Sequence, residues 1–421
     1  MEKENRKSKI LPKDNIILAS GAYLPPDKVR NILLFGGSGM AKPFYYTEPN
    51  LMQCNTSYVC ADPSGILYQQ FEILLEHQGY KVKCLNLAKM DKGNHYNPFR
   101  YIHNNEDIEA LVKTLFANTT SLKKAWDEPS KRKAETALLT ALIAYLHHHA
   151  VPKEQNFTNV MNLLRTAYFN PLDQTFQDIE DAEPESFTAI HYKEYKKYAG
   201  KYNDEIVLSC SVRLQAFDLR DVVELTKTDD IDLETVCNEK TALFVITPPN
   251  ISDFHFNFLA SIMYTQLLDI IAKQNFKGGH STHLIMDQAE MVTIPKFASR
   301  LDAAQKHGLI TSLFIRSPAF MTKKYGRDWE NISEKCDAAV LLGQGEIDVY
   351  DWFRDYAGLT AGPRKRMFFP GDDRTAYLED VRTLSEGECL VYIKGSPTIR
   401  EWKYTAVDHP SWGNVKNTVS Q

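Results

Sequence analysis

The sequence has no long apolar run of the kind that crosses a membrane. No segment contains the roughly 18 consecutive apolar residues that a membrane-spanning helix needs. The charged start, residues 1–9, also lacks the apolar core of a secretion signal. We therefore expect a soluble chain with no integral membrane segment.

Paired cysteines and an excess of basic charge are missing as well. The seven cysteines are an odd number and none belongs to a C-x-x-C pair, so a reduced, intracellular chain is expected. The net charge of −5 argues against a uniformly basic surface that coats nucleic acid, although it leaves room for a local basic channel. With 421 residues, 43% of them hydrophobic, the chain has enough length for two domains or for one domain with a large insertion.

A phosphate-binding loop follows the first apolar run, but two of its functional residues are missing. Residues 31–35 read as a buried strand, and residues 36–43 (GGSGMAKP) stand where a Walker A loop, G-x-x-x-x-G-K-[ST], would lie. In a working loop, glycines let backbone N–H groups wrap the phosphates, the lysine reaches the β- and γ-phosphates, and the hydroxyl holds Mg²⁺. Here Ala41 replaces the last glycine, and Pro43, which has neither a hydroxyl nor a backbone N–H, replaces the serine or threonine. The degenerate nucleotide-binding positions are Gly36, Gly37, Ser38, Gly39, Met40, Ala41, Lys42 and Pro43.

A second nucleotide-site motif is incomplete too. Residues 282–287 predict an apolar strand that ends in Asp287, where a Walker B carboxylate would hold Mg²⁺ through water. The next position carries Gln288, which cannot accept a proton, so general-base catalysis there is lost. The alternative is that Asp287 simply caps the turn after the strand. Together with the loop at 36–43, the pattern favours a relic nucleotide site.

The two motifs predict a geometry for this site. We expect the strands before Lys42 and Asp287 to be neighbours, so that both side chains face one cleft. Because an unpaired buried ammonium is costly, Lys42 is expected to pair with Asp287, with Asp62 as a second candidate. Met40 and Pro43 would then fill the phosphate space.

The order of apolar patterns predicts an α/β fold with a helical insertion. Strands alternate with helical spacing up to about residue 100 and again from about 240, which favours a parallel, helix-covered sheet. Residues 104–231 show helical spacing alone, broken by an acidic stretch at 173–185 that reads as a solvated loop. The expected strands are 31–35, 58–61, 80–85, 241–247, 282–287, 310–315, 338–342 and 388–393. The expected division is an N-terminal segment 1–30, a discontinuous α/β domain 31–103 and 232–410, an all-α insertion 104–231, and a C-terminal tail 411–421.

Several short motifs, in order along the chain, carry a family resemblance. They include GGSG at 36–39, EPNLMQCNTS at 48–57, DPSG at 62–65, NPF at 97–99 and LIMD at 284–287. With these motifs the chain, over roughly residues 30–410, resembles the TraG-type coupling proteins of conjugative type IV secretion in Gram-positive bacteria. The resemblance implies a RecA-like P-loop NTPase fold with a parallel central sheet and an inserted all-α domain. In that family the motor forms a hexameric ring that feeds relaxase-bound single-stranded DNA into the secretion channel.

The departures from the family pattern all affect the nucleotide site. The family has G-K-T where this chain has Ala41, Lys42 and Pro43, and D-E where it has Asp287 and Gln288. The glutamine that senses the γ-phosphate in the family is matched by Arg316, and D-P-K-G becomes DPSG at 62–65. The arginine-rich stretch before that strand appears as AQKH at 304–307, and the two N-terminal membrane helices of the family are not expected.

These departures lead to two main hypotheses. The first is a degenerate coupling-protein homologue, a pseudo-ATPase that needs no cofactor and acts by binding. Its partners would be type IV secretion or relaxosome proteins, an active paralogue, or single-stranded DNA, and the hypothesis leaves a hexamer open. The protein would lie in the bacterial cytoplasm, or at the inner face of the membrane if these partners recruit it there. The alternative is an active DNA-translocating ATPase with an aberrant loop, which uses ATP and Mg²⁺ and takes Glu290 as its base. A folded remnant of a decaying mobile element, without a role, is a third reading.

Two weaker signals have plainer explanations. Three histidines at 147–149 point in different directions from a helix, so a cationic helix end is favoured over a metal site. Four tyrosines alternate with lysines between 192 and 202, which would suit base stacking. Aromatic packing with solvated lysine ends is the favoured reading of that pattern.

Overall fold

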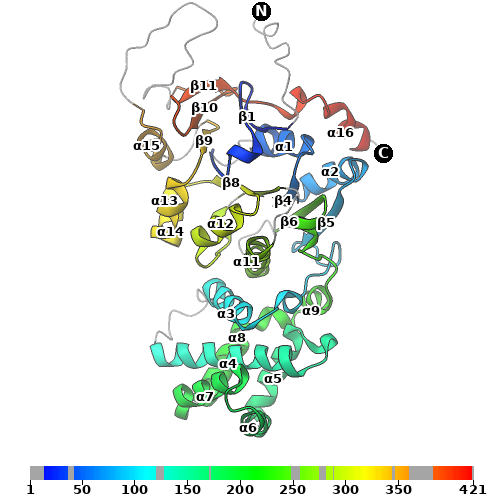
Figure 1. Ribbon diagram of the computed structural model, residues 1–421, viewed down its shortest axis with the longest axis vertical. Helices are drawn as coiled ribbons and strands as arrows, with labels where there is room; N and C mark the ends of the chain where they lie inside the picture. The colour runs from blue at the N-terminus through cyan, green and yellow to red at the C-terminus, as the bar shows by residue number, and fades with distance from the viewer. Residues whose placement is uncertain are drawn as a thin grey trace, which may run out of the picture.

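The computed structural model shows a sheet layer and a helical lobe stacked along the long axis of the molecule (Figure 1). The structure describes residues 14–36, 42–119, 128–169, 172–247, 257–274, 281–287, 289–343, 347–359 and 383–419. Residues 37–41 of the candidate phosphate loop and Gln288 therefore lie outside the described residues.

The described residues contain a nine-stranded, mostly parallel sheet with the order β11-β10-β9-β3-β8-β7-β4-β6-β5. Strands β9, β3, β8, β7, β4, β6 and β5 run parallel, and β10 and β11 form an antiparallel edge. Every strand expected from the sequence belongs to this sheet, which confirms the α/β fold. The strands are β3 (Asn31–Phe35), β4 (Ser57–Ala61), β5 (Lys81–Asn86), β6 (Thr241–Ile246), β7 (Thr282–Met286), β8 (Leu309–Ile315), β9 (Ala338–Leu341), β10 (Glu388–Ile393) and β11 (Ile399–Trp402).

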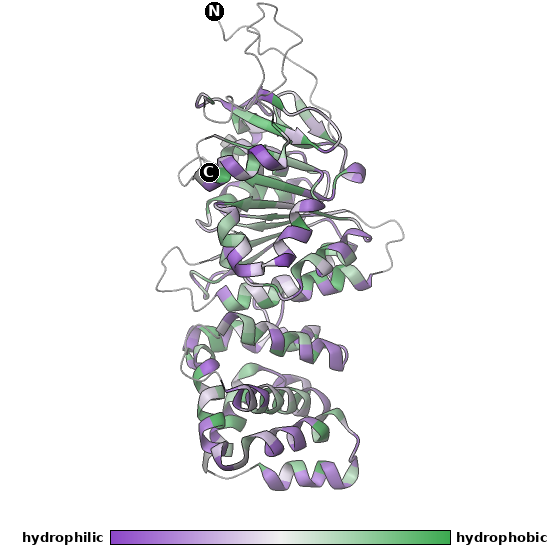
Figure 2. Ribbon diagram, turned by 90° about the vertical axis from the view of Figure 1, so that its left-hand side faces the viewer, coloured by the Kyte–Doolittle hydropathy of each residue, from purple (hydrophilic) through white to green (hydrophobic). Residues whose placement is uncertain are grey.

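Helices cover both faces of the sheet, so its central strands are apolar on both sides. Along β3, Ile32 and Leu34 face a core built with α2 (Ile66–His77), while Leu33 and Phe35 face the core on the other side. Figure 2 shows the apolar strands lying between helices of mixed polarity. The helices on the second face are α11 (Asn257–Lys273), α12 (Phe297–Gln305), α13 (Pro318–Tyr325), α14 (Arg327–Glu334) and α15 (Ile347–Tyr356).

A short hairpin, β1 (Ile16–Ala19) and β2 (Ala22–Leu24), packs on the first face beside α1 (Glu48–Met52). The Asn50 side chain accepts a hydrogen bond from the Ile17 N–H (2.9 Å) and donates to the Ile17 carbonyl (3.0 Å). The C-terminal helix α16 (Trp412–Val419) packs against α2 on the same face.

The helical lobe is the chain between β5 and β6. Its described residues include eight α-helices and the short 3₁₀ segments between them, without a strand, and one continuous apolar core joins them to α11 under the sheet. The long helix α4 packs along α7. The helices are α3 (Asn105–Thr119), α4 (Pro129–His149), α5 (Phe157–Phe169), α6 (Asp173–Ala182), α7 (Phe187–Ala199), α8 (Asn203–Arg213), α9 (Arg220–Lys227) and α10 (Thr235–Asn238).

The expected loop at 173–185 is wrong, because residues 173–182 form helix α6. Phe176 supplies its apolar anchor, stacked on Tyr192 with ring centroids 3.9 Å apart. The acidic residues lie on the solvent face, where Gln174 donates to Asp178 and Gln177 donates to Asp181 one turn on. The contact of Phe176 with α7 therefore anchors a helix that composition alone assigns to a loop. Among the described helices, none is both long and apolar enough to cross a membrane.

Candidate functional site

The candidate site lies where β3, β8 and β7 end together at one edge of the sheet. Lys42 follows β3, Arg316 follows β8, and Asp287 follows β7. The expectation that β3 and β7 are neighbours is wrong, because β8 pairs with both and lies between them. The two side chains nevertheless meet across the end of β8, with Lys42 Nζ 3.9 Å from Asp287 Oδ1.

The Lys42–Asp287 contact is a partly buried ion pair. The side chains are 13% and 18% exposed, so water screens the attraction less than it does at an open surface. The distance is longer than a hydrogen bond, and the ammonium also lies 5.9 Å from the ring centroid of Phe314 on β8. The lysine of the degenerate loop therefore has a carboxylate and an aromatic face as neighbours.

The helix after Lys42 begins irregularly. Residues Pro43–Thr47 form a π-helical turn, closed by a hydrogen bond from the Glu48 N–H to the Pro43 carbonyl, before α1 continues. A π-turn of this kind is uncommon inside helices and is frequent at functional sites. Pro43 occupies the first position of the turn and offers neither an N–H nor a hydroxyl. The start of this helix is thus poorer in donors than a working phosphate loop requires.

Glu290 adds a second carboxylate to the site. It lies in a short 3₁₀ helix, Ala289–Met291, just past Asp287. Burial raises the pKa of Glu290, while the charge of Lys42 and a hydrogen bond from the Arg316 N–H act in the opposite direction. The buried Oε2 atom of Glu290 has no hydrogen-bond partner among the described residues. This carboxyl is the one that the sequence singles out as a substitute base.

The sequence favours a solvated charge run for Lys323 and Lys324 over a phosphate contact, but the structure places Lys324, partly buried, behind Glu290. Lys324 is on α13, and its Nζ donates to the Glu290 carbonyl at 2.5 Å. Burial lowers the pKa of Lys324 to about 8. The packing of α13 against the short helix Ala289–Met291 brings Lys324 to the site.

The other two candidates are Arg316 and Asp62. The Arg316 side chain is exposed at the end of β8. The Asp62 carboxylate accepts hydrogen bonds from the Tyr68 N–H (2.8 Å) and the Ser64 hydroxyl (3.2 Å). Asp62 therefore stabilises the start of α2, and the expectation that it could serve Lys42 is wrong.

For two of the four tyrosines between 192 and 202, the structure supports the reading as aromatic packing. Tyr192 and Tyr195 are buried in the helical lobe, and their hydroxyls donate to Asp173 and Asn203. These two rings are therefore inaccessible to nucleic-acid bases. Among the described residues, no group of three or more His, Cys, Asp or Glu side chains is arranged to hold a metal ion.

The fold and this edge of the sheet define an α/β protein of the P-loop ATPase type, with a helical insertion. The chain belongs to the type IV secretory system conjugative DNA transfer family, whose model matches residues 2–339. The TraG-type resemblance of the sequence motifs is thereby confirmed. Among curated protein sequences, none matches this chain significantly.

Solved structures share the fold at low sequence identity. The bacterial conjugative coupling protein TrwBdeltaN70, unbound, is 15% identical with a TM-score of 0.66, and the match covers 96% of this chain and 91% of the solved chain. TrwB in complex with ADP and Mg²⁺ is 14% identical with a TM-score of 0.68, covering 96% and 92%. VirB4 of Thermoanaerobacter pseudethanolicus is 12% identical with a TM-score of 0.59, covering 95% and 99%.

Proposed function

We propose that this chain is a pseudo-ATPase of the coupling-protein family, which acts by binding rather than by hydrolysing ATP. The observation that supports this most directly is the 3.9 Å separation of Lys42 Nζ and Asp287 Oδ1. In a working site the lysine contacts the β- and γ-phosphates and the aspartate serves the metal. Here each of the two groups neutralises the other.

The residues at the site do not fit Mg²⁺. Magnesium requires near-octahedral oxygen ligands, usually one or two carboxylates together with water and phosphate oxygens. Pro43 stands where the hydroxyl ligand belongs and has no oxygen in its side chain. Asp287, the remaining ligand position, faces an ammonium instead. We accordingly propose a function that needs neither ATP nor Mg²⁺.

A protein of this kind would work as part of an assembly. We propose that its partners are type IV secretion or relaxosome proteins, or an active coupling protein of the same family. Mixed rings with an active paralogue would use the shared fold, and single-stranded DNA would pass through the paralogue's motor. We place the chain at the inner face of the bacterial membrane, held there by these partners.

ATP hydrolysis by the full chain, with and without single-stranded DNA, tests the proposal. We expect the unmodified chain and Lys42→Ala to hydrolyse ATP at the same background rate. Both proteins lack the hydroxyl ligand for Mg²⁺ at position 43 and the carboxylate base at position 288. A matched gain variant, Ala41→Gly with Pro43→Thr and Gln288→Glu, should recover ATP binding in a thermal-shift titration before it recovers turnover. DNA-stimulated hydrolysis by the unmodified chain, abolished in Lys42→Ala, would overturn the proposal.

The binding role needs a separate experiment. Native mass spectrometry of this chain mixed with an intact TraG-type coupling protein should show assemblies that contain both chains. A mixture in which each protein assembles only with itself, together with no binding to relaxosome proteins, would contradict a role through partners.

The second candidate is an active translocation ATPase whose base is Glu290. The observation that favours it is the buried Glu290 Oε2, which has no hydrogen-bond partner among the described residues, beside Lys42 and Asp287. A raised carboxyl pKa suits a general base that works near neutral pH. If the chain hydrolyses ATP, Glu290→Gln should lower the rate by roughly 10²- to 10⁴-fold. An active chain that is unaffected by Glu290→Gln would exclude this base.

A further inference from the structure

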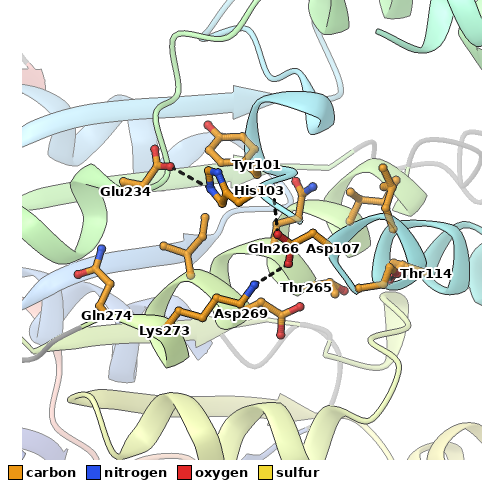
Figure 3. A pocket seen from close by; sticks show the side chains of 14 residues that line it. Tyr101, His103, Asp107, Thr114, Glu234, Thr265, Gln266, Asp269, Lys273 and Gln274 are labelled. Carbon is orange, nitrogen blue, oxygen red and sulfur yellow. Dashed lines mark hydrogen bonds and ion pairs between the residues drawn. The ribbon is translucent and has the colours of Figure 1, made fainter. Parts of the chain in front are cut away.

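A cavity of about 170 Å³ lies where the helical lobe meets the sheet layer (Figure 3). Helix α3 of the lobe forms one wall and α11, under the sheet, forms the other. The segment around Glu234, where the chain returns from the lobe, closes a third side. The interior is mainly apolar, with walls from Tyr101, Leu111, Ile262 and Ile270.

Three carboxylates line the rim of this cavity, and they come from three separate parts of the chain. They are Asp107 on α3, Asp269 on α11, and Glu234 on the return segment. Asp269 is neutralised by Arg300, whose guanidinium donates to both of its oxygens at 2.9 and 3.1 Å. Asp107 pairs with Lys273, whose side chain is half-exposed, and Glu234 lies beside His103.

The counterion of Asp107 is an exchangeable one. Lys273 reaches from α11 and its Nζ lies 2.5 Å from Asp107 Oδ1, as Figure 3 shows. The Lys273 side chain is 51% exposed while that of Asp107 is 11% exposed. A half-exposed lysine on a flexible stem loses little when it returns to water. The carboxylate, by contrast, stays in place at the cavity and needs a cation.

The neighbour of Glu234 is a histidine, which forms an ion pair with it only when protonated. His103 Nε2 lies 3.6 Å from Glu234 Oε1, and the imidazole is half-exposed. Burial, followed by a hydrogen bond with Asp232, raises the pKa of Glu234. A further positive charge near this carboxyl would therefore stabilise its ionised form.

We propose that this cavity binds a small organic cation, with its apolar part in the cavity and its ammonium at Asp107 in place of Lys273. The size is suitable, because a dry cavity of about 150 Å³ accepts one benzene ring. The site is separate from the Lys42–Asp287 pair and goes beyond the proposed function. Since the ligand would touch α3, α11 and the return segment together, its binding would stiffen the joint between the lobe and the sheet.

Phenethylamine, 2-phenylethanol and phenylacetate are matched probes, because they share a ring and a short stem and differ in charge. Binding to the full chain can be followed by ligand-observed NMR titration and by thermal shift. We expect the amine to bind about fivefold to tenfold more tightly than the alcohol, as one partly screened ion pair allows. The carboxylate should bind most weakly.

Two substitutions with opposite expected effects make the test specific. Asp107→Asn keeps the acceptor for the His103 N–H and should abolish the preference for the amine over the alcohol. Lys273→Gln removes the competing ammonium and should tighten amine binding severalfold without a similar gain for the alcohol. Ala110→Leu, which adds bulk to the wall of the cavity, should weaken both probes.

The ion pair Lys335–Asp302 supplies matched controls, since it lies on α12 and the end of α14 and has comparable exposure on the lysine. Asp302→Asn and Lys335→Gln should leave the affinity of every probe unchanged. Equal binding of amine and alcohol to the unmodified chain would overturn the proposal. So would weaker amine binding in Lys273→Gln, or no binding of any probe in the millimolar range.

Discussion

The Nε2 atom of His283 lies 2.7 Å from the Oγ atom of Ser312, inside the sheet on the neighbouring strands β7 and β8. Both residues are fully buried, and Ser312 Oγ also lies 2.7 Å from the hydroxyl of Tyr46. This chain of hydrogen bonds joins the helix after Lys42 to the strand that ends at Asp287. A titratable side chain thus lies in the core between two of the strands that end at the candidate site.

The first prediction is that acid destabilises the fold through His283. Burial lowers the pKa of His283 from 6.5 to about 3, so between these values the unfolded chain binds a proton that the folded chain excludes. The contribution of the neutral His283 to the stability of the fold is therefore fully present above pH 6.5, and it is lost as the pH falls toward 3. By about pH 4.5 the loss should be roughly 2 to 3 kcal/mol.

Urea unfolding across this pH range measures the effect in His283→Leu. The variant should be less stable at neutral pH but should lose less stability on acidification than the unmodified chain. Part of the acid dependence should remain, because burial also lowers the pKa of His409 to about 4. His77→Gln, at the exposed end of α2, is the control. Identical acid limbs in His283→Leu and the unmodified chain would contradict the prediction.

The second prediction concerns the Lys42–Asp287 pair. In a double-mutant cycle of Lys42→Met and Asp287→Asn, the double variant should be more stable than the sum of the single changes predicts, by about 1 kcal/mol. The reason is that each single change leaves the other charge partly buried and less compensated. The exposed pair Lys81–Glu239 provides the comparison cycle, with an expected coupling below about 0.5 kcal/mol. Additive effects at Lys42 and Asp287 would show that the pair contributes nothing to the fold.

The third prediction concerns a buried ion pair in the helical lobe. Arg213 donates to Glu135 at 2.8 Å and to Thr119 at 2.8 Å, and Glu135 is 4% exposed. Arg213→Met should destabilise the chain by about 3 to 5 kcal/mol, because it leaves a buried carboxylate without its counterion. Thermal unfolding of this variant measures the cost.

A matched control and a rescue variant test that reason. Breaking the exposed pair Lys113–Glu109 with Lys113→Gln should cost at most about 0.5 kcal/mol. Adding Glu135→Gln to Arg213→Met should restore part of the lost stability, since the uncompensated charge is removed. No recovery in the double variant would point to packing, including the contact of Arg213 with the Phe116 ring, as the dominant contribution.

The fourth prediction concerns the turn that closes the edge strand β5. Gly93 has a φ of +129°, and a Cβ built there would lie 2.6 Å from the carbonyl oxygen of Cys84. Asn94 is the next residue in the turn, and its N–H donates to the Cys84 carbonyl at 2.7 Å. Gly93→Ala should therefore cost about 3 kcal/mol, from backbone strain and a clash that cannot relax without losing this hydrogen bond.

Gly200→Ala serves as the comparison for Gly93→Ala. Gly200 also has a positive φ, of +48°, but a Cβ there would meet nothing within 4 Å. Its expected cost is about 1 kcal/mol, from backbone strain alone. Equal losses of melting temperature in the two variants would show that the close approach to Cys84 is unimportant.

The sequence by itself determined the elements and the chemical content of the candidate site. The mainly apolar run at residues 31–35 favours a strand buried on both faces, because most positions along it avoid water. The helical spacing within 104–231 predicted a helical lobe, although not its helix α6. Pro43 and Gln288 restrict the chemistry without any coordinates, since they lack a metal ligand and a proton acceptor in every conformation.

Only the tertiary structure decided which residues meet. Strand order depends on crossovers between distant segments, which is why β8 lies between β3 and β7 against expectation. Helix α6 exists because Phe176 finds the ring of Tyr192, and that ring belongs to another helix. The acids around the cavity, Asp107 and Glu234, are far apart in the chain and carry no shared pattern. Periodicity reports the local environment of each segment, whereas a site or cavity is formed by long-range packing, so the sequence of each segment alone could not predict it.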